Sequence, residues 1–291
     1  TINLWTPLCL GMTSITYANP LEFKTIAKII LEDKPELLVG TPLFLEGYIK
    51  QSNPGDFASI KLTVSGADRC PEHLRALYKE KHDIEIIEGY GTTETSPVIS
   101  VNPRGANKPG SIGKPIPGAQ IRIQNLDTGT DSLIGEIGKI LVKGDGVMQG
   151  YLNNMEESSL RLKSGWYDTG DLGYLDEDGY LWHKGRLKRF VKIGGEMVSL
   201  VMVEETMDDL TPLEVECCAV ELPDAKRGSK IVGVTSSKID KQDLNKRLAK
   251  TLPNLALPKK YVHVPEFPRM GSGKTDFRTL TEIVRQLDEQ D

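Results

Sequence analysis

Long apolar runs are missing from this 291-residue sequence, in which no stretch approaches the ~20 consecutive apolar residues that a membrane-spanning helix needs. The first residues also lack a basic segment followed by a long apolar one, which argues against a secretory signal peptide there. The sequence has no initial methionine and begins within an apolar stretch. We therefore expect it to be a fragment of a longer protein.

Cysteine and histidine are scarce, with four of each. The cysteines form no C-x-x-C pair, and the neighbours Cys217 and Cys218 would point to opposite faces of a strand. The histidines are scattered without the spacing of metal ligands. These patterns argue against a structural zinc site and predict reduced thiols, as in a cytoplasmic protein.

Positive charge is also in deficit, with a net charge of -5 and a pI of about 5.6. Basic and aromatic residues do not interleave, so a nucleic-acid partner is not expected. The deficit is uneven, because the part from Lys184 onward has 19 Lys+Arg against 17 Asp+Glu, a balance of +2 that leaves -7 for the part before it. This more basic part is either an ordinary solvated surface or one that attracts an acidic protein partner.

The first hundred residues alternate between segments that favour strands and segments that favour helices. Asn19-Pro20 begins a run of apolar residues spaced by three and four, which predicts a helix. Further helices are predicted from Thr41 and Pro71, with strands at 36–39, 60–64 and 84–87. This order predicts an α/β fold with parallel strands, whose ligands lie at the carboxyl ends of the strands.

Two changes of pattern divide the chain. From about Val98, proline and glycine separate short alternating segments, which predicts an antiparallel, barrel-like β-subdomain. After Lys188, helices and strands mix again in a small α+β domain. The predicted divisions are therefore 1–98, 99–187 and 188–291.

Three motifs carry candidate chemistry, at residues 88–97, 165–205 and 268–276. In the second, glycines flank Asp171, and a carboxylate on such a turn can accept two vicinal hydroxyls. Arg186, one strand later, can cover the same polar group. A hairpin turn is the structural alternative for this acidic segment.

The other two motifs offer groups for a nucleotide. Thr92, Thr93 and the neighbouring backbone amides can hold phosphate oxygens, Tyr90 offers a flat face to a base, and Glu94 is a suitable Mg²⁺ ligand. Lys274 can bring two anions together for nucleotidyl transfer. The alternatives are a threonine-rich loop with an exposed glutamate and a solvated loop lysine.

In this order, the three motifs resemble those of the adenylate-forming (AMP-binding) superfamily of acyl-CoA synthetases, luciferases and peptide-synthetase adenylation domains, over essentially the whole chain. The segment KRFVKIGGEMVSLVMVE is most similar to the acyl-[acyl-carrier-protein] synthetase half of bacterial bifunctional 2-acylglycerophosphoethanolamine acyltransferases. The resemblance implies that a fatty acid is activated with ATP and Mg²⁺ to acyl-AMP and passed to the phosphopantetheine thiol of acyl carrier protein. Coenzyme A is the alternative acceptor. The implied location is the cytoplasm or the inner face of the inner membrane, with membrane contact only through parts outside this sequence.

The resemblance also implies a role for each motif residue. Lys188 corresponds to the hinge about which a mobile small domain turns, and the Gly194-Gly195 loop would line the path of the thiol. Catalytic roles fall on Thr93, Lys274 and Glu94, which is also the Mg²⁺ ligand. Nucleotide contacts are implied for Gly66, Ala67, Glu88, Gly89, Tyr90, Gly91, Thr92, Asp171 and Arg186.

One departure from the family concerns the glycine-rich pyrophosphate loop that normally ends in a lysine, which does not occur in these residues. The first half of the large domain, which carries that loop, is also missing. Without the loop the β- and γ-phosphates lack a cradle. We therefore expect this chain alone to bind AMP or acyl-AMP weakly and not to adenylate. A non-catalytic module that docks a carrier protein is the alternative of another class, although such a module does not need Glu94 or Lys274.

Overall fold

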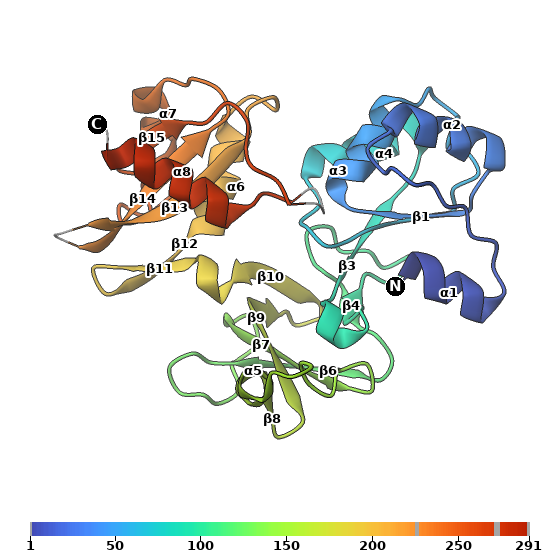
Figure 1. Ribbon diagram of the computed structural model, residues 1–291, viewed down its shortest axis with the longest axis horizontal. Coiled ribbons are helices and arrows are strands. Elements are labelled where there is room, and N and C mark those ends of the chain that lie inside the picture. Colours follow the sequence, from blue (N-terminus) through green and yellow to red (C-terminus); the bar gives the residue numbers. More distant parts are fainter. Residues whose placement is uncertain (1, 225–226, 271–273, 290–291) are drawn as a thin grey trace. The chain divides into compact units, whose positions relative to one another are not determined.

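The computed structural model describes residues 2–224, 227–270 and 274–289 and divides the chain into two compact units (Figure 1). The first unit ends at His183 and the second begins at Lys184, inside strand β10 (Leu181–Arg186). The sequence analysis placed this division at Lys188. The predicted α/β lobe and β-rich subdomain both belong to the first unit.

The α/β lobe has the predicted parallel strands, with helices between them. Strands β1, β2 and β3 are adjacent and parallel, and β4 and β5 continue the sheet in antiparallel orientation. The helix expected from Asn19 begins at Phe23, because Asn19 accepts hydrogen bonds from the backbone of Leu21 and Glu22 and forms a turn. The elements are α1 (Ile2–Leu10), α2 (Phe23–Asp33), β1 (Leu37–Gly40), α3 (Pro42–Lys50), β2 (Leu62–Ser65), α4 (Glu72–His82), β3 (Ile86–Tyr90), η1 (Thr93–Thr95), β4 (Ser100–Val101) and β5 (Lys114–Pro115).

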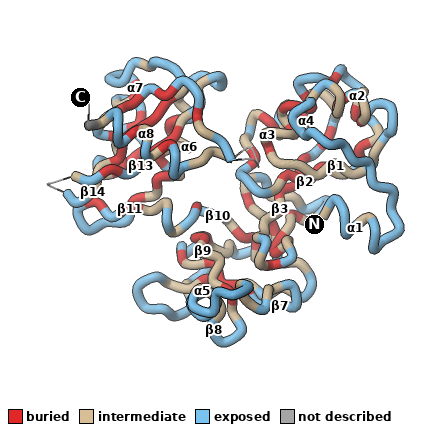
Figure 2. Tube along the Cα trace, in the orientation of Figure 1, coloured by how far each residue is buried: buried red, intermediate tan, exposed pale blue. Residues whose placement is uncertain are grey.

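The lobe is held by a core between helices α2, α3 and α4, which Figure 2 shows as buried segments. Leu45, Ile49, Leu74 and Tyr78 are completely buried there, and the Tyr78 hydroxyl donates to the Leu45 carbonyl oxygen at 2.9 Å. The apolar residues that predicted the helices are therefore those that fix them against the sheet. This packing leaves the carboxyl ends of β2 and β3 as the start of the motif loops.

The β-rich part of the first unit is an antiparallel sheet in the order β10-β9-β7-β6, with β8 paired to β9. Ile99, Ile123, Ile140 and Leu181 form its core. The pairing between β7 and β9 shifts, because Lys139 pairs with Leu172 and Leu141 pairs with Asp168. Residues 169–171 thus face Ile140 alone, as a bulge in β9. The elements are β6 (Ala119–Gln124), β7 (Gly138–Gly144), α5 (Met155–Arg161), β8 (Leu162–Lys163) and β9 (Trp166–Leu175).

The turn between β9 and β10 is stabilised by Asp176. The Asp176 carboxylate accepts hydrogen bonds from Lys108 Nζ at 2.6 Å and Trp182 Nε1 at 2.8 Å. Burial disfavours the charged form, but these hydrogen bonds outweigh it and lower the pKa of Asp176 to about 2. Asp176 therefore ties the 103–110 loop to the hairpin.

Replacing Asp176 by asparagine is expected to lower the free energy of unfolding at pH 7 by about 1–2 kcal/mol. A depressed pKa gives stability that is present above the ordinary carboxyl pKa and is lost as the pH falls toward about 2. The variant should therefore lose less stability than the parent between pH 4 and pH 3, measured by urea unfolding. Asp178→Asn, at the exposed second partner of Lys108, is the matched control. Equal acid sensitivity of parent and Asp176→Asn would contradict the prediction.

The second unit is the predicted α+β domain. Its three-stranded sheet pairs β14 with β13 in antiparallel and with β15 in parallel orientation. Helices α6 and α7 contribute Met207 and Leu248 to one core, and α8 contributes Leu280 and Val284 to the other. Its elements are η2 (Leu187–Arg189), β11 (Phe190–Ile193), β12 (Glu196–Ser199), α6 (Leu200–Leu210), β13 (Cys217–Asp224), β14 (Gly228–Thr235), α7 (Lys241–Leu248), β15 (Lys260–His263) and α8 (Phe277–Glu289). Among the helices described, none has the length and apolar character required to cross a membrane.

Candidate functional site

Asp171 lies in the bulge of β9, and its carboxylate is almost completely buried. Thr169 fixes the bulge, because its hydroxyl donates to the Ile140 carbonyl oxygen at 2.9 Å and accepts from the Asp171 backbone amide at 3.1 Å. Gly170 has a φ of +74°, and a Cβ there would lie 2.9 Å from Arg161 Nη1. The sequence analysis placed Asp171 on a turn. In the structure Asp171 lies within strand β9, and the bulge sets the direction of its side chain.

The bulge brings Asp171 to Tyr90, at the end of β3 in the first motif. The Tyr90 hydroxyl donates a hydrogen bond of 2.5 Å to Asp171 Oδ2. Burial raises the pKa of Tyr90 well above its usual value, and the charge of Asp171 raises it further, so the hydroxyl remains a donor. His183 Nε2 lies 3.7 Å from Asp171 Oδ1, and the His183 and Tyr90 ring centroids are 5.7 Å apart. Tyr90 and Asp171, which are 81 positions apart in sequence, thus join the first two motifs at one carboxylate.

The threonine-rich loop is held by hydrogen bonds between its own residues. The Thr92 amide donates to Thr95 Oγ1 at 3.1 Å, and Thr95 Oγ1 donates to the Thr92 carbonyl oxygen at 2.9 Å. A Cβ at Gly91 would lie 1.6 Å from the carbonyl oxygen of Pro97, so only glycine fits this turn. The loop therefore presents Thr93 and Glu94 from a fixed backbone.

Glu94 has a partner that the sequence analysis missed. The Tyr151 hydroxyl donates to Glu94 Oε1 at 2.9 Å, and the backbone amide of Met148 donates to the Glu94 carbonyl oxygen at 2.8 Å. Tyr167, next to Asp168 in β9, lies close enough for the charge of Glu94 to add to the effect of burial in raising the pKa of its hydroxyl. Tyr151 is 57 residues from Glu94, and only the fold brings the two together.

Glu88 points into the protein interior. Glu88 Oε1 accepts from Arg75 Nη1 at 2.7 Å and from the Gly110 amide at 3.1 Å. Burial raises the pKa of this carboxyl group, and the Gly110 and Arg75 contacts oppose the shift. The Glu88 carbonyl oxygen accepts from the Asn102 amide at 2.9 Å. These contacts hold β3 in place, and the nucleotide contact implied for Glu88 stays a prediction.

The small-residue turns at the ends of β2 and β3 are adjacent, as predicted for parallel strands. A Cβ at Gly66 would lie 3.5 Å from the carbonyl oxygen of Gly89. Ala67 has a φ of +70°, in the left-handed region. Gly66, Ala67 and Gly89 therefore form a narrow backbone surface, and these are residues for which the sequence analysis expected nucleotide contacts.

The remaining predicted residues belong to the second unit. Arg186 is the last residue of β10, and Lys188 lies in η2. Gly194 and Gly195, with φ values of +59° and +98°, form the two-residue turn between β11 and β12. Lys274 lies next to the bridge between Arg269 and Thr275, and its carbonyl oxygen accepts from the Met270 amide at 2.8 Å. Residues 271–273 of the third motif lie outside the described residues.

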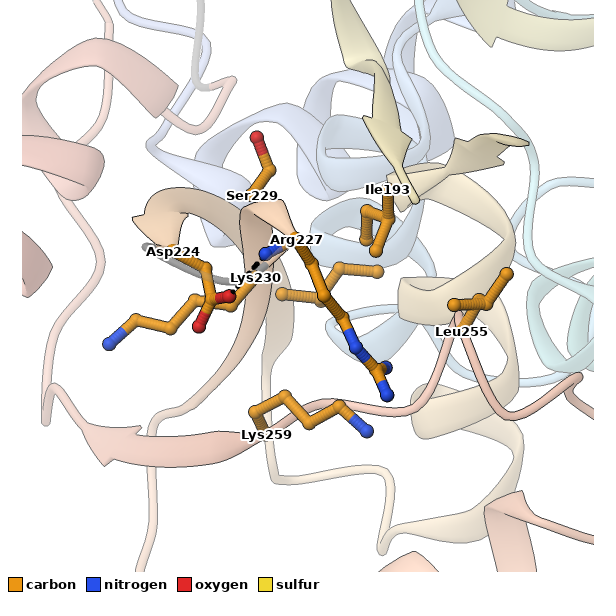
Figure 3. Close-up of a pocket in the computed structure, with 8 residues that line it drawn as sticks. Ile193, Asp224, Arg227, Ser229, Lys230, Leu255 and Lys259 are labelled. Carbon is orange, nitrogen blue, oxygen red and sulfur yellow. Dashed lines mark hydrogen bonds between the residues drawn. The ribbon is translucent and has the colours of Figure 1, made fainter. Parts of the chain in front are cut away.

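A cavity of about 290 Å³ lies in the second unit beside the Gly194-Gly195 turn (Figure 3). The Gly194 amide donates to the carbonyl oxygen of Arg227, at 3.4 Å, and Figure 3 shows the Arg227 and Lys259 side chains reaching into the same space. The sequence analysis did not predict this cavity. Its lining consists of Ile193, Asp224, Arg227, Ser229, Lys230, Ile231, Leu255 and Lys259.

The carboxylates of the first unit suit a metal ion that is bound partly by the phosphates of a substrate. Within residues 2–224, 227–270 and 274–289, no group of three or more His, Cys, Asp or Glu side chains could hold a metal ion. Proteins usually bind Mg²⁺ through one or two carboxylates together with substrate phosphates. Glu94, oriented by Tyr151, fits that mode of binding.

Comparison with known proteins gives two family matches. The family "AMP-binding enzyme" matches residues 1–152, and "AMP-binding enzyme C-terminal domain" matches residues 211–274. A long-chain-fatty-acid–CoA ligase of Bacillus subtilis is 34% identical over 271 residues, which are 91% of this chain and 48% of that protein. One from Haemophilus influenzae is 32% identical over 288 residues, 97% of this chain and 51% of that protein.

A solved structure has the same fold. ATP-bound MatB from Rhodopseudomonas palustris superposes with a TM-score of 0.87 at 27% identity, over 97% of this chain and 56% of that one. The chain thus spans about half the length of the relatives it matches. Its fold is that of adenylate-forming enzymes, with a mixed α/β lobe, a curled antiparallel sheet and a small C-terminal domain. By the match over its first 152 residues, this chain belongs to the AMP-binding enzyme family.

Proposed function

We propose that this chain is the nucleotide-binding and C-terminal part of an acid–thiol ligase that activates a fatty acid with ATP. The observation that carries the proposal is the hydrogen bond between Tyr90 and Asp171, which joins the first two motifs at one buried carboxylate. The names of the two fatty-acid ligases among the relatives support the substrate class.

We propose that Asp171 accepts the ribose hydroxyls and that the Tyr90 ring faces the base. Thr92 and Thr93 would contact the phosphates, and Glu94 would hold a Mg²⁺ ion, which would offset the negative charge of the phosphates. The bulge in β9 and the closed threonine loop support this assignment, since both hold their functional groups on fixed backbone. Arg186 is the proposed second contact to the ribose.

The proposed chemistry has two steps. An oxygen of the fatty-acid carboxylate attacks the α-phosphorus of ATP, and pyrophosphate leaves with the electrons of the broken P–O bond. A thiolate then attacks the acyl carbon, which forms a thioester and releases AMP. Lys274 is the proposed cation of the first step, because it brings two anions together, and the Gly194-Gly195 turn is the proposed guide of the thiol in the second.

We propose acyl carrier protein as the thiol acceptor, within a protein that also reacylates phospholipids. The more basic second part and the KRFVKIGGEMVSLVMVE segment support this choice. Coenzyme A is the second candidate, and the names of the relatives favour it. Both acceptors carry a phosphopantetheine arm, and Arg227 and Lys259 provide cations for its phosphate beside the Gly194-Gly195 turn.

The acceptor is tested in the full-length protein with palmitate, ATP, Mg²⁺ and either carrier protein or coenzyme A. Faster thioester formation on the carrier protein is the expected result. Faster formation on coenzyme A would make coenzyme A the acceptor.

Lys259→Glu should raise the KM for the acceptor by about tenfold and leave acyl-AMP formation unchanged. Lys250→Glu, at an exposed lysine of the same unit, is the control. If the full-length parent forms no acyl-AMP, the ligase proposal fails, and the non-catalytic module that docks a carrier protein remains as the interpretation.

A further inference from the structure

We propose that His183 is a positioning residue of the nucleotide site, which holds the Asp171 carboxylate at Oδ1, the oxygen that does not accept the Tyr90 hydroxyl. The inference rests on the proposed function, because it assigns Asp171 to the ribose. It adds a residue to which the sequence analysis gave no role, although it lies within the motif at 165–205. His183 lies in β10, beside the strand that contains Asp171, and is the last residue of the first unit.

The two oxygens of Asp171 face different neighbours. Oδ2 accepts the Tyr90 hydroxyl, and Oδ1 lies 3.7 Å from Nε2 of His183. The His183 ring also lies against the Tyr90 ring, with an angle of 35° between their planes. Because Tyr90 contacts both other members, the three side chains form one cluster in which a movement of His183 affects the other two.

The distance of 3.7 Å exceeds that of a hydrogen bond, but it is within reach of a charge pair or of a small rotation of the imidazole. A buried carboxylate that is hydrogen-bonded at Oδ2 and faces the imidazole at Oδ1 has little room to turn, so its remaining acceptor sites keep one direction. Such a fixed direction favours the capture of two vicinal hydroxyls, because less orientational freedom is lost when the nucleotide binds. We therefore expect His183 to affect nucleotide affinity rather than the chemical step.

A second histidine pair in the first unit provides a matched comparison. His73 Nε2 also lies 3.7 Å from a carboxylate oxygen, that of Glu46, between helices α4 and α3. The side chain of Glu46 is 28% exposed, whereas that of Asp171 is 4% exposed. Solvent therefore screens the His73 pair, and neither of its members belongs to a motif. Loss of His73 should leave nucleotide binding unchanged.

The experiment measures ATP-dependent pyrophosphate exchange by the full-length protein at varied ATP concentration. His183→Ala is expected to raise the KM for ATP by about tenfold and to change kcat by less than about twofold. His183→Gln should restore most of the affinity, because its amide nitrogen can donate from nearly the position of Nε2. His183→Leu keeps the bulk but not the donor and should behave as alanine does. His73→Ala should match the parent.

The outcomes separate this inference from the proposed function. Asp171→Ala is expected to lower exchange by more than about 100-fold. If Asp171→Ala has no effect, the proposed function fails and the role of His183 fails with it. If Asp171→Ala abolishes exchange while His183→Ala keeps the KM of the parent, only the inference about His183 is overturned. Full affinity in His183→Leu would also overturn it, since packing alone would then suffice.

Discussion

Replacing Lys274 by alanine in the full-length protein is expected to lower the rate of acyl-adenylate formation by at least about 100-fold. Adenylation brings a carboxylate and the α-phosphate of ATP together, and both are anions. A cation at the reacting atoms offsets their repulsion and the charge that develops on the phosphate oxygens. Pyrophosphate exchange measures this step without the thiol acceptor.

The second half-reaction is the internal control for Lys274. When acyl-AMP is supplied ready-made, thioester formation by the Lys274→Ala variant should stay close to that of the parent, because the phosphoryl step has already occurred. Lys250→Ala, an exposed lysine in the same unit, should leave both steps unchanged. If Lys274→Ala forms acyl-AMP at the normal rate, the role proposed for this lysine is wrong.

Replacing Arg75 by leucine is expected to lower the free energy of unfolding by about 3–5 kcal/mol. The side chain of Arg75 is 13% exposed and that of Glu88 is 5% exposed, so the substitution leaves a buried carboxylate without its cation. The Cys70 carbonyl oxygen also loses a donor at 2.6 Å. Urea unfolding at pH 7 gives the measurement.

The pH dependence identifies Glu88 as the source of this loss. Burial already raises the pKa of Glu88 above its ordinary value, and loss of Arg75 should raise it further. A raised carboxyl pKa means that stability is lost as the pH increases through it, so the deficit should shrink toward pH 4. Glu72→Gln breaks only the exposed partner of Arg75 and should cost at most about 1 kcal/mol. A loss of that size in Arg75→Leu would show that the buried pair contributes little.

Much of the fold could be predicted from the sequence, because it depends on local spacing. The helices predicted from Thr41 and Pro71 correspond to α3 (Pro42–Lys50) and α4 (Glu72–His82), which have these two residues at their N-caps. The order of strands and helices was enough to predict parallel pairing and ligand-binding loops at the carboxyl ends of the strands. Each of these features depends on residues a few positions apart.

The site could be predicted only where its residues occur in motifs. Tyr151 lies outside the three motifs. His183 lies within the motif at 165–205, but no local pattern links it to Asp171. The inward orientation of Glu88 depends on Arg75, which lies on a different element. Strand register decided the remaining error, because the bulge at Asp171 becomes visible only when β9 is paired with β7.

That pairing makes chain length at Asp171 as important as residue identity. Three residues of β9 face one residue of β7, so β9 carries two extra residues, an even number that keeps the alternation of side chains in step on the two sides of the bulge. Removing one residue from 169–171 would leave both flanking ladders able to form but would turn the carboxylate toward the opposite face of the sheet. Insertions and deletions here should therefore abolish nucleotide binding even in a protein that remains folded.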